Sequence, residues 1–235
     1  MSAFAVHLAY EFRTGVRNWT LLLMTYLLPL GFFLMTALIM PGLNPFFLPV
    51  MVPAMVIFAI LAATLLGLPD PLVQAREAGI FRSYKINGIP AGSILFIPAL
   101  TTALHLAIVT VIITAVGGSV FGAPLPESWS GFLFTFAAAT LGCAGLSVLI
   151  GVASSSSRVQ LLWSQIIFLP SMLLGGLMIP WGQLPPVASK VALLLPATHA
   201  MNAFKGLAME GPADFDPWAS IATPVSYTHL RAHET

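Results

Sequence analysis

The sequence predicts an all-α protein that crosses a membrane several times. Four stretches contain no Asp, Glu, Lys or Arg, namely 18–69, 86–126, 128–157 and 159–189. Across the chain 58% of the residues are hydrophobic and only 7% are charged, whereas about a quarter of the residues in a soluble domain are charged. Because a helix needs about 20 apolar residues to cross a bilayer core of about 30 Å, these stretches are long enough to hold membrane spans.

Five spans are expected, at 19–40, 46–68, 91–116, 129–152 and 161–178. The first uncharged stretch holds two of them, because the segment 41–45, Pro-Gly-Leu-Asn-Pro, is expected to break the helix. The segment 225–235 resembles the translation of a sequencing adapter and is left out of the reasoning about the fold. We therefore expect one transmembrane domain over 1–224, in a natural protein that continues with a sixth span.

The basic residues indicate which side of the membrane each loop faces. Lys and Arg occur before the first span, between the second and third, and between the fourth and fifth, at Arg13, Arg17, Arg76, Arg82, Lys85 and Arg158. The loops after the first and third spans contain neither residue type. Since cytoplasmic loops are enriched in Lys and Arg, the amino terminus is expected in the cytoplasm and the segment after the fifth span outside.

The residues before the first span are expected to form an amphipathic helix at the membrane interface. One face carries an apolar residue every four positions, at Phe4, Leu8, Phe12 and Val16. The other faces carry His7, Glu11, Arg13 and Arg17. Such a helix lies flat on a bilayer, with its apolar side chains toward the acyl chains and its basic residues near anionic headgroups. The alternative is a cytoplasmic extension of the first span.

The segment 70–90 places five charged residues between two uncharged spans. Asp70, as an N-cap before Pro71 at the first helical position, predicts a short helix, and Gly88 and Pro90 predict a break after it. The alternative is a solvated turn that obeys the positive-inside rule.

The segment 179–218, after the fifth span, is too polar and too rich in proline for a full span, although 187–195 is apolar apart from Lys190. Backbone that enters a membrane without crossing it is tolerated only when it packs on protein. We therefore expect an external re-entrant helical hairpin in this segment.

Three segments resemble those of a known family in their order and spacing. The segment 77–82, Glu-Ala-Gly-Ile-Phe-Arg, followed by Ile-Asn-Gly-Ile-Pro at 86–90, is similar to the Glu-x-Gly-Thr-Leu-Glu-Arg loop of ABC type-2 transporter permeases. The segments 173–186 and 195–207 resemble that family's Gly-x-x-x-Pro-x-x-x-Leu-Pro signature and its outer Pro-x-x-x and Arg-x-x-x elements. The chain departs from the family pattern where Ile80 and Phe81 replace Thr-Leu, where Ser83 replaces an expected charge, and where Lys205 replaces Arg.

The resemblance covers 1–218 and implies a function. The chain would be the membrane subunit of an ATP-driven ABC exporter for a hydrophobic or amphipathic substrate, in a bacterial or archaeal cytoplasmic (inner) membrane. It would form a homodimer, or a heterodimer with a similar permease, and the resemblance implies a twelve-helix pore domain. A separate ABC ATPase subunit would bind ATP and dock on the loop 70–87 through Arg76, Glu77, Gly79, Arg82 and Lys85. The external re-entrant motif would contain Pro180, Pro185, Pro196 and His199.

The motifs that the chain lacks limit its chemistry. The sequence contains no Gly-x-x-x-x-Gly-Lys-Ser/Thr phosphate loop, so ATP hydrolysis would belong to a partner. It also lacks His-Glu-x-x-His, Cys-x-x-Cys and Gly-x-Ser-x-Gly motifs, and its expected spans contain no carboxylates for a proton relay. We therefore expect a transport subunit rather than an enzyme, with no catalytic residues, no metal site, no cofactor of its own and no nucleic-acid partner.

His105 is the ionisable residue placed in the middle of an expected span. It could line a pathway or make a polar contact between helices. Two other function classes stay open beside the exporter. One is a channel or carrier that works without ATP, and the other is a membrane assembly protein that transports nothing.

Overall fold

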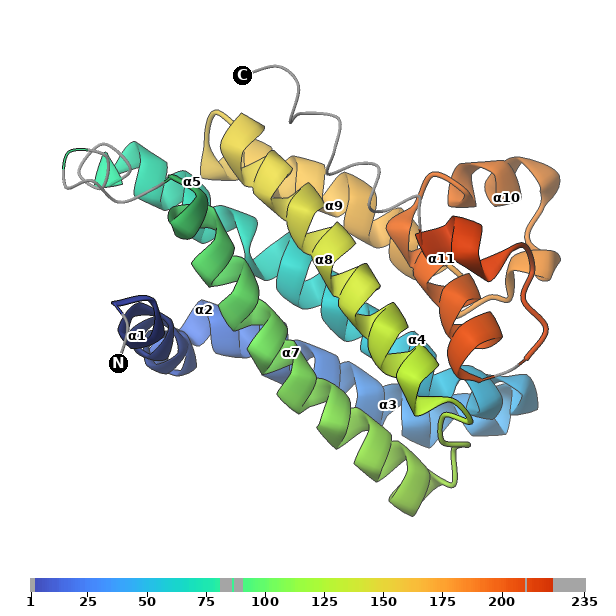
Figure 1. Ribbon diagram of the computed structural model, residues 1–235. Helices are drawn as coiled ribbons and strands as arrows, with labels where there is room; N and C mark the ends of the chain where they lie inside the picture. Colours follow the sequence, from blue (N-terminus) through green and yellow to red (C-terminus); the bar gives the residue numbers. More distant parts are fainter. Residues whose placement is uncertain (1–2, 81–85, 87–90, 210, 222–235) are drawn as a thin grey trace.

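The computed structural model describes residues 3–80, 86, 91–209 and 211–221. In these ranges all regular secondary structure is helical, which confirms the predicted fold class (Figure 1). The α-helices are α1 (Ala3–Arg17), α2 (Trp19–Leu22), α3 (Leu28–Leu43), α4 (Met51–Leu61), α5 (Pro69–Glu77), α7 (Ala91–Phe121), α8 (Trp129–Ala153), α9 (Ser157–Leu174), α10 (Pro186–Ala192) and α11 (Pro196–Ala203). Short π-helical segments at Leu23–Leu27, Ala62–Gly67 and Phe204–Ala208 continue α2, α4 and α11.

Within the described ranges, four continuous helices are long and apolar enough to cross a membrane: Trp19–Leu43, Phe47–Glu77, Leu95–Phe121 and Trp129–Ala153. They coincide with the first four predicted spans. The fifth predicted span, 161–178, corresponds to α9, whose 18 residues measure about 27 Å. It is not among the four helices, and polar Arg158, Gln160 and Ser164 fall in its first half. The fifth span therefore stays a prediction.

The second of these helices forms the centre of the bundle. Every residue from Met51 to Leu65 is buried, and 89% of the most apolar window of Phe47–Glu77 lies inside the protein, against 28% for Trp19–Leu43. A helix that is apolar on all sides is stable only when neighbours surround it. Here α3, α7, α8 and α11 pack against α4, and α9 packs against the π-helical segment that follows it.

The predicted break between the first two spans lies later than expected. Helix α3 continues through Pro41 and ends at Leu43, and the Asn44 amide still bonds to the Met40 carbonyl at 2.7 Å. Pro41 is tolerated in this last turn, where the helix is about to end and one missing N–H costs little. The chain then passes through a short 3-10 helix, Pro45–Val50, into α4.

The two ends of the bundle are different. Helices α1 and α5 lie at one end and α10 and α11 at the other (Figure 1). The segment after α9, for which a helical hairpin was predicted, forms two short helices, α10 and α11, whose seven and eight residues are too few to span a bilayer. Every residue of α11 is buried, and this helix packs on α4, α8 and α9.

Candidate functional site

The short helix α5 lies at the α1 end of the bundle and continues from the second span. It begins at Pro69, with Leu68 as the N-cap residue, so the expectation that Asp70 caps it is wrong. Leu68 keeps helical dihedral angles, and the chain therefore needs no side-chain cap there. Asp70 lies in the first turn instead, where its carboxylate accepts a hydrogen bond of 2.7 Å from the Gln74 amide.

Arg76 fixes α5 to the end of α8. Its guanidinium donates one hydrogen bond of 2.7 Å to the Val152 carbonyl and another to the Ser154 carbonyl. The last carbonyls of a helix have no partner within the helix and carry partial negative charge, so a cation stabilises them. Beside this contact Leu72 packs on Gly151, where an added Cβ would lie 3.2 Å from the Leu72 side chain. The two helices therefore approach closely.

The rest of the predicted ATPase-contacting loop follows α5. Glu77 is exposed in its last turn, and Gly79 is exposed with a φ of +70°, a backbone conformation that suits glycine. The Gly79 amide bonds to the Arg76 carbonyl at 3.0 Å and closes the turn. Arg82 and Lys85 lie outside the described residues. The contact of these residues with an ATPase remains a prediction.

His105 joins three elements at the same end of the bundle. Its side chain is fully buried, and its Nδ1 lies 2.7 Å from the Tyr26 hydroxyl of the first span. The imidazole stacks on the Phe12 ring of α1, with centroids 4.2 Å apart and planes 7° apart. A Cβ added to Gly15 would lie 3.0 Å from Nε2. His105 thus makes the predicted kind of polar contact between helices, and this contact also places α1.

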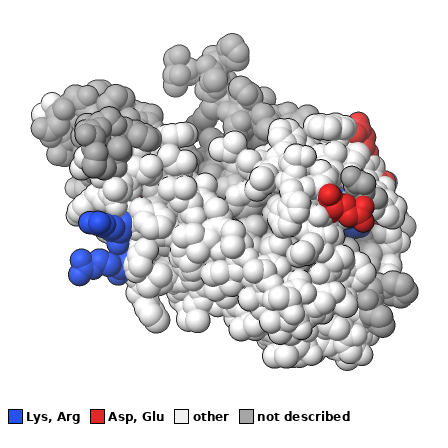
Figure 2. Space-filling view, turned by 60° about the horizontal axis from the view of Figure 1, so that its bottom comes forward, with Lys and Arg blue, Asp and Glu red and all other residues white. Residues whose placement is uncertain are grey.

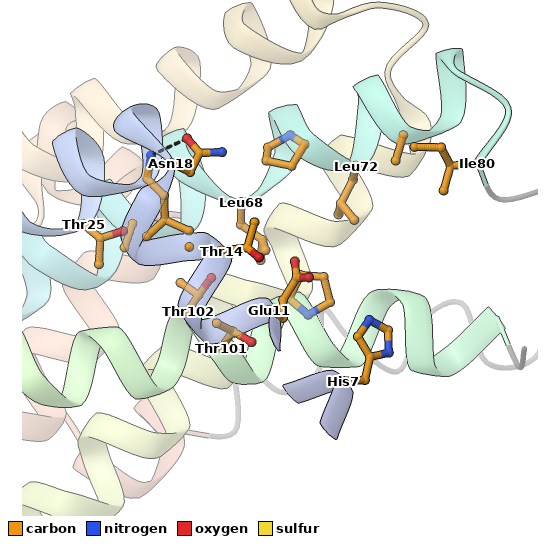
Figure 3. A pocket seen from close by; sticks show the side chains of 17 residues that line it. His7, Glu11, Thr14, Asn18, Thr25, Leu68, Leu72, Ile80, Thr101 and Thr102 are labelled. Carbon is orange, nitrogen blue, oxygen red and sulfur yellow. Dashed lines mark hydrogen bonds between the residues drawn. The ribbon is translucent and has the colours of Figure 1, made fainter. Parts of the chain in front are cut away.

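A cavity of about 200 Å³ lies between α1, α5 and α7. Figure 3 shows His7 and Glu11 extending from α1, with Thr101 and Thr102 on α7 and Leu72 on α5. The lining also contains Thr14, Gly15, Asn18, Thr25 and Ile80. Its chemistry is mixed, with a carboxylate, an imidazole, an amide and several hydroxyl groups beside apolar walls.

The charges are uneven on the face shown in Figure 2. Basic side chains project at its left edge, acidic side chains gather at its right, and most of the surface between them is uncharged. An uncharged band between two charged ends is the arrangement expected of a protein whose middle faces lipid.

The predicted external motif lies at the opposite end, around α10 and α11. Its prolines begin short helices: Pro180 precedes the 3-10 helix Trp181–Gln183, Pro185 precedes α10, and Pro196 is the first residue of α11. This use fits proline, because the first turn of a helix needs no N–H donor. His199 bonds through Nε2 to the Leu193 carbonyl at 2.8 Å, and its ring meets Phe215 edge-on.

Asn202 holds the chain that follows these helices, and no sequence motif pointed to this role. Its amide nitrogen donates to the Phe215 carbonyl at 2.7 Å and the Ser220 hydroxyl at 2.9 Å. Its oxygen accepts from the Asp214 amide at 2.7 Å and the Phe215 amide at 3.2 Å. Lys205 adds an ion pair with Asp214 at 2.9 Å. The signal available in the sequence was a single amide residue inside an apolar helix, which is costly to bury without partners.

A family model described as "ABC-2 type transporter" matches residues 2–209 of this chain. Comparisons with curated proteins and with solved structures gave no match. The matched range contains the cavity, α5, His105, α10 and α11.

Proposed function

Because the chain belongs to the ABC-2 type transporter family, we propose that it is the transmembrane subunit of an ATP-driven exporter, powered by a separate ABC ATPase subunit. The family match confirms the resemblance seen in the sequence and identifies the chain as a membrane transport component. The proposal adds the direction of transport, ATP as the source of energy and a hydrophobic or amphipathic substrate.

The observation that carries the proposal is the attachment of α5 to the spans. Helix α5 lies at an end of the bundle, packs on both α8 and α9, and is fixed to the α8 terminus through Arg76. A partner that pushes on α5 would therefore move α8 and α9 with it. The exposed Glu77 and Gly79 at the tip leave this end free for a partner to approach.

Two apolar cavities support a hydrophobic or amphipathic substrate. They lie between α7 and α8 and measure about 540 and 430 Å³. The larger is lined by residues such as Val111, Leu133 and Phe136, and its hydroxyl groups come from Thr110, Thr114 and Ser119. Ligand sites for such molecules are mostly apolar, with few polar groups that fix orientation.

The proposed assembly is a homodimer, or a heterodimer with a similar permease, in a bacterial or archaeal cytoplasmic membrane. We place the amino terminus and α5 in the cytoplasm, following the distribution of Lys and Arg. In this orientation α5 faces the compartment that holds ATP, and α10 and α11 face the outside.

The test reverses the charges of the loop that follows α5. The double variant Glu77→Arg with Arg82→Glu is compared with the wild type after co-reconstitution with the ATPase that copurifies with the protein. We expect binding of the ATPase to weaken at least about tenfold, because both reversed charges would lose their ion pairs with the ATPase and meet like charges instead. ATP-driven efflux should fall with the binding. Glu127→Arg, on an exposed residue of the α7–α8 loop, is the matched control and should change neither.

Unchanged binding and efflux in the double variant would show that the loop is not the docking site. Flux in vesicles without any ATPase, unaffected by ATP, would instead identify a channel or an ATP-independent carrier. A protein that binds neither ATPase nor substrate would be an assembly protein.

A further inference from the structure

We propose that the cavity between α1, α5 and α7 binds the primary ammonium headgroup of a membrane lipid, with Glu11 as its counter-ion. The inference does not depend on the proposed export function, because binding is measured on the chain alone.

The charge of the lining selects a cation. Glu11 supplies a carboxylate, and among the residues that the structure describes no Lys or Arg lines the cavity. Within the described part of the chain Glu11 has neither a hydrogen bond nor an ion pair, although its side chain is half-buried. An ionised carboxylate partly removed from water is stabilised by a cation that pairs with it. A phosphate would be repelled by this carboxylate, and the one basic side chain among the described lining residues is the imidazole of His7.

Two hydroxyl groups of the lining, those of Thr14 and Thr101, favour a ligand that donates hydrogen bonds. Thr14 donates its hydroxyl to the Tyr10 carbonyl at 2.9 Å, and Thr101 donates to the Ile97 carbonyl at 2.8 Å. With these protons used, the two oxygens have only lone pairs left for a ligand. The cavity wall therefore offers acceptors, and a primary ammonium offers three N–H donors. A quaternary choline group has the same charge but no donors.

The position of the cavity suits a headgroup. Helix α1 is the predicted interfacial helix, and Trp19 begins the first span immediately after it. The cavity extends from Glu11 on this helix to Thr25 inside the span, which covers the boundary between headgroups and acyl chains. Arg13 and Arg17 are exposed and are not part of the lining, so the surface of α1 stays basic while the cavity is acidic.

The size of the cavity suits the same ligand. Its volume of about 200 Å³ corresponds to several water molecules, each of which takes up about 30 Å³ in the liquid. An ethanolamine group, which has only a few heavy atoms, fits this space. The ligand would contact α1, α5 and α7 together.

The experiment is native mass spectrometry of the full chain in a mild detergent, with equal amounts of phosphatidylethanolamine, phosphatidylcholine and phosphatidylglycerol. We expect phosphatidylethanolamine to be retained at least about fivefold over the other two, because a charge-assisted hydrogen bond to Glu11 is lost with either of them. Glu11→Gln should abolish this preference. Glu127→Gln makes the same change on an exposed carboxylate outside the cavity and should keep it.

A second variant protects the test against misfolding. Ala75→Phe fills the cavity from α5 without changing a charge, and it too should lower retention of phosphatidylethanolamine. Circular dichroism and a single symmetric elution peak establish that each variant is folded. Equal retention of the three lipids by the wild type would overturn the proposal, as would undiminished retention by either folded variant.

A soluble headgroup distinguishes the source of the ammonium. Glycerophosphoethanolamine at millimolar concentration is added to the complex with phosphatidylethanolamine. Displacement of the lipid would support a site for the ammonium group from any source, including free amines. Retention of the lipid against this competitor would support a site that needs the acyl chains as well.

Discussion

The imidazole of His105 lies flat on the ring of Phe12, with centroids 4.2 Å apart and planes 7° apart. Because Phe12 belongs to α1 and His105 to α7, this contact joins the surface helix to a membrane span. It turns Phe12, which the sequence pattern assigned to the lipid-facing side of α1, toward the protein. Helix α1, which was predicted to lie at the membrane interface, is therefore also held by a tertiary contact.

Gly15 permits this docking, and a methyl group there should disturb it. A Cβ at Gly15 would lie 3.0 Å from the His105 Nε2, whereas a Cβ at Gly31 in α3 would meet nothing within 4 Å. Both glycines are helical, so both alanine variants gain about 1 kcal/mol of helix propensity. We expect Gly15→Ala to be less stable than Gly31→Ala by about 1–2 kcal/mol in reversible unfolding by SDS. Equal stability of the two variants would show that α1 does not press on His105.

Tyr26 and His105 should be energetically coupled. The hydroxyl of Tyr26 lies 2.7 Å from Nδ1 of His105, and both residues belong to helices that are long and apolar enough to cross a membrane. Hydrogen bonds between membrane helices contribute about 0.6 kcal/mol on average and up to about 1.7 kcal/mol. A double-mutant cycle of Tyr26→Phe and His105→Phe should therefore give a coupling free energy in this range.

The control is a second double-mutant cycle, made with Tyr10→Phe and His105→Phe. Tyr10 is exposed on α1 and should not couple to His105. Additive effects in the cycle with Tyr26 would mean that the hydrogen bond contributes nothing to stability.

Arg76 should position α5 through its two bonds to α8. Arg76→Ala removes both donors and leaves the Val152 and Ser154 carbonyls without this cation. In the reconstituted complex we expect ATP hydrolysis to continue while efflux per ATP falls at least about fivefold, since a loosened α5 transmits less movement. Arg76→Lys, which keeps one charge but loses the fork of donors, should lie between the wild type and Arg76→Ala.

Arg158→Ala is the control, because it also removes a guanidinium. Arg158 is exposed at the start of α9. If Arg76→Ala lowered hydrolysis and efflux in equal proportion, Arg76 would act on ATPase binding and not on the attachment of α5.

Asn202 should be the residue that holds the chain 211–220 on α11. Asn202→Leu removes four hydrogen bonds and leaves the backbone groups of Asp214 and Phe215 without their partner. We expect a loss of about 2–4 kcal/mol in the free energy of unfolding and faster cleavage near residue 214 by a protease added outside. Gln183→Leu, which removes an exposed amide in the same external region, is the control. Unchanged cleavage in Asn202→Leu would contradict this role.

The sequence predicted the features that depend on composition and periodicity. The first four spans, the surface helix α1 and the hairpin of α10 and α11 follow from runs of apolar residues, four-residue spacing and prolines, all of which act locally. Boundaries were less certain, because a proline such as Pro41 is compatible with the last turn of a helix as well as with a break. The start of α5 was misplaced because Leu68 stays helical and makes a cap at Asp70 unnecessary.

Contacts between distant residues could not be predicted in this way. The separation of 79 residues between Tyr26 and His105 leaves no local pattern, and the partners of Asn202 are backbone groups, which every residue has. Arg76 was expected to meet a partner protein, which stays a prediction, and its bonds to two carbonyls of the same chain were not foreseen. Charge alone does not say which acceptor a cation will find.

Neighbouring helices surround the second span, and this determines which substitutions the span tolerates. Spans one and three each present one side to lipid, so a saturation scan of either should show a permissive position about every three to four residues. Between Met51 and Leu65 no such rhythm is available, since neighbours contact all sides of the helix. The segment from Met51 to Leu65 is thus shielded from lipid by its neighbours. The shape of a side chain, rather than its hydrophobicity, governs which residue each of these positions accepts.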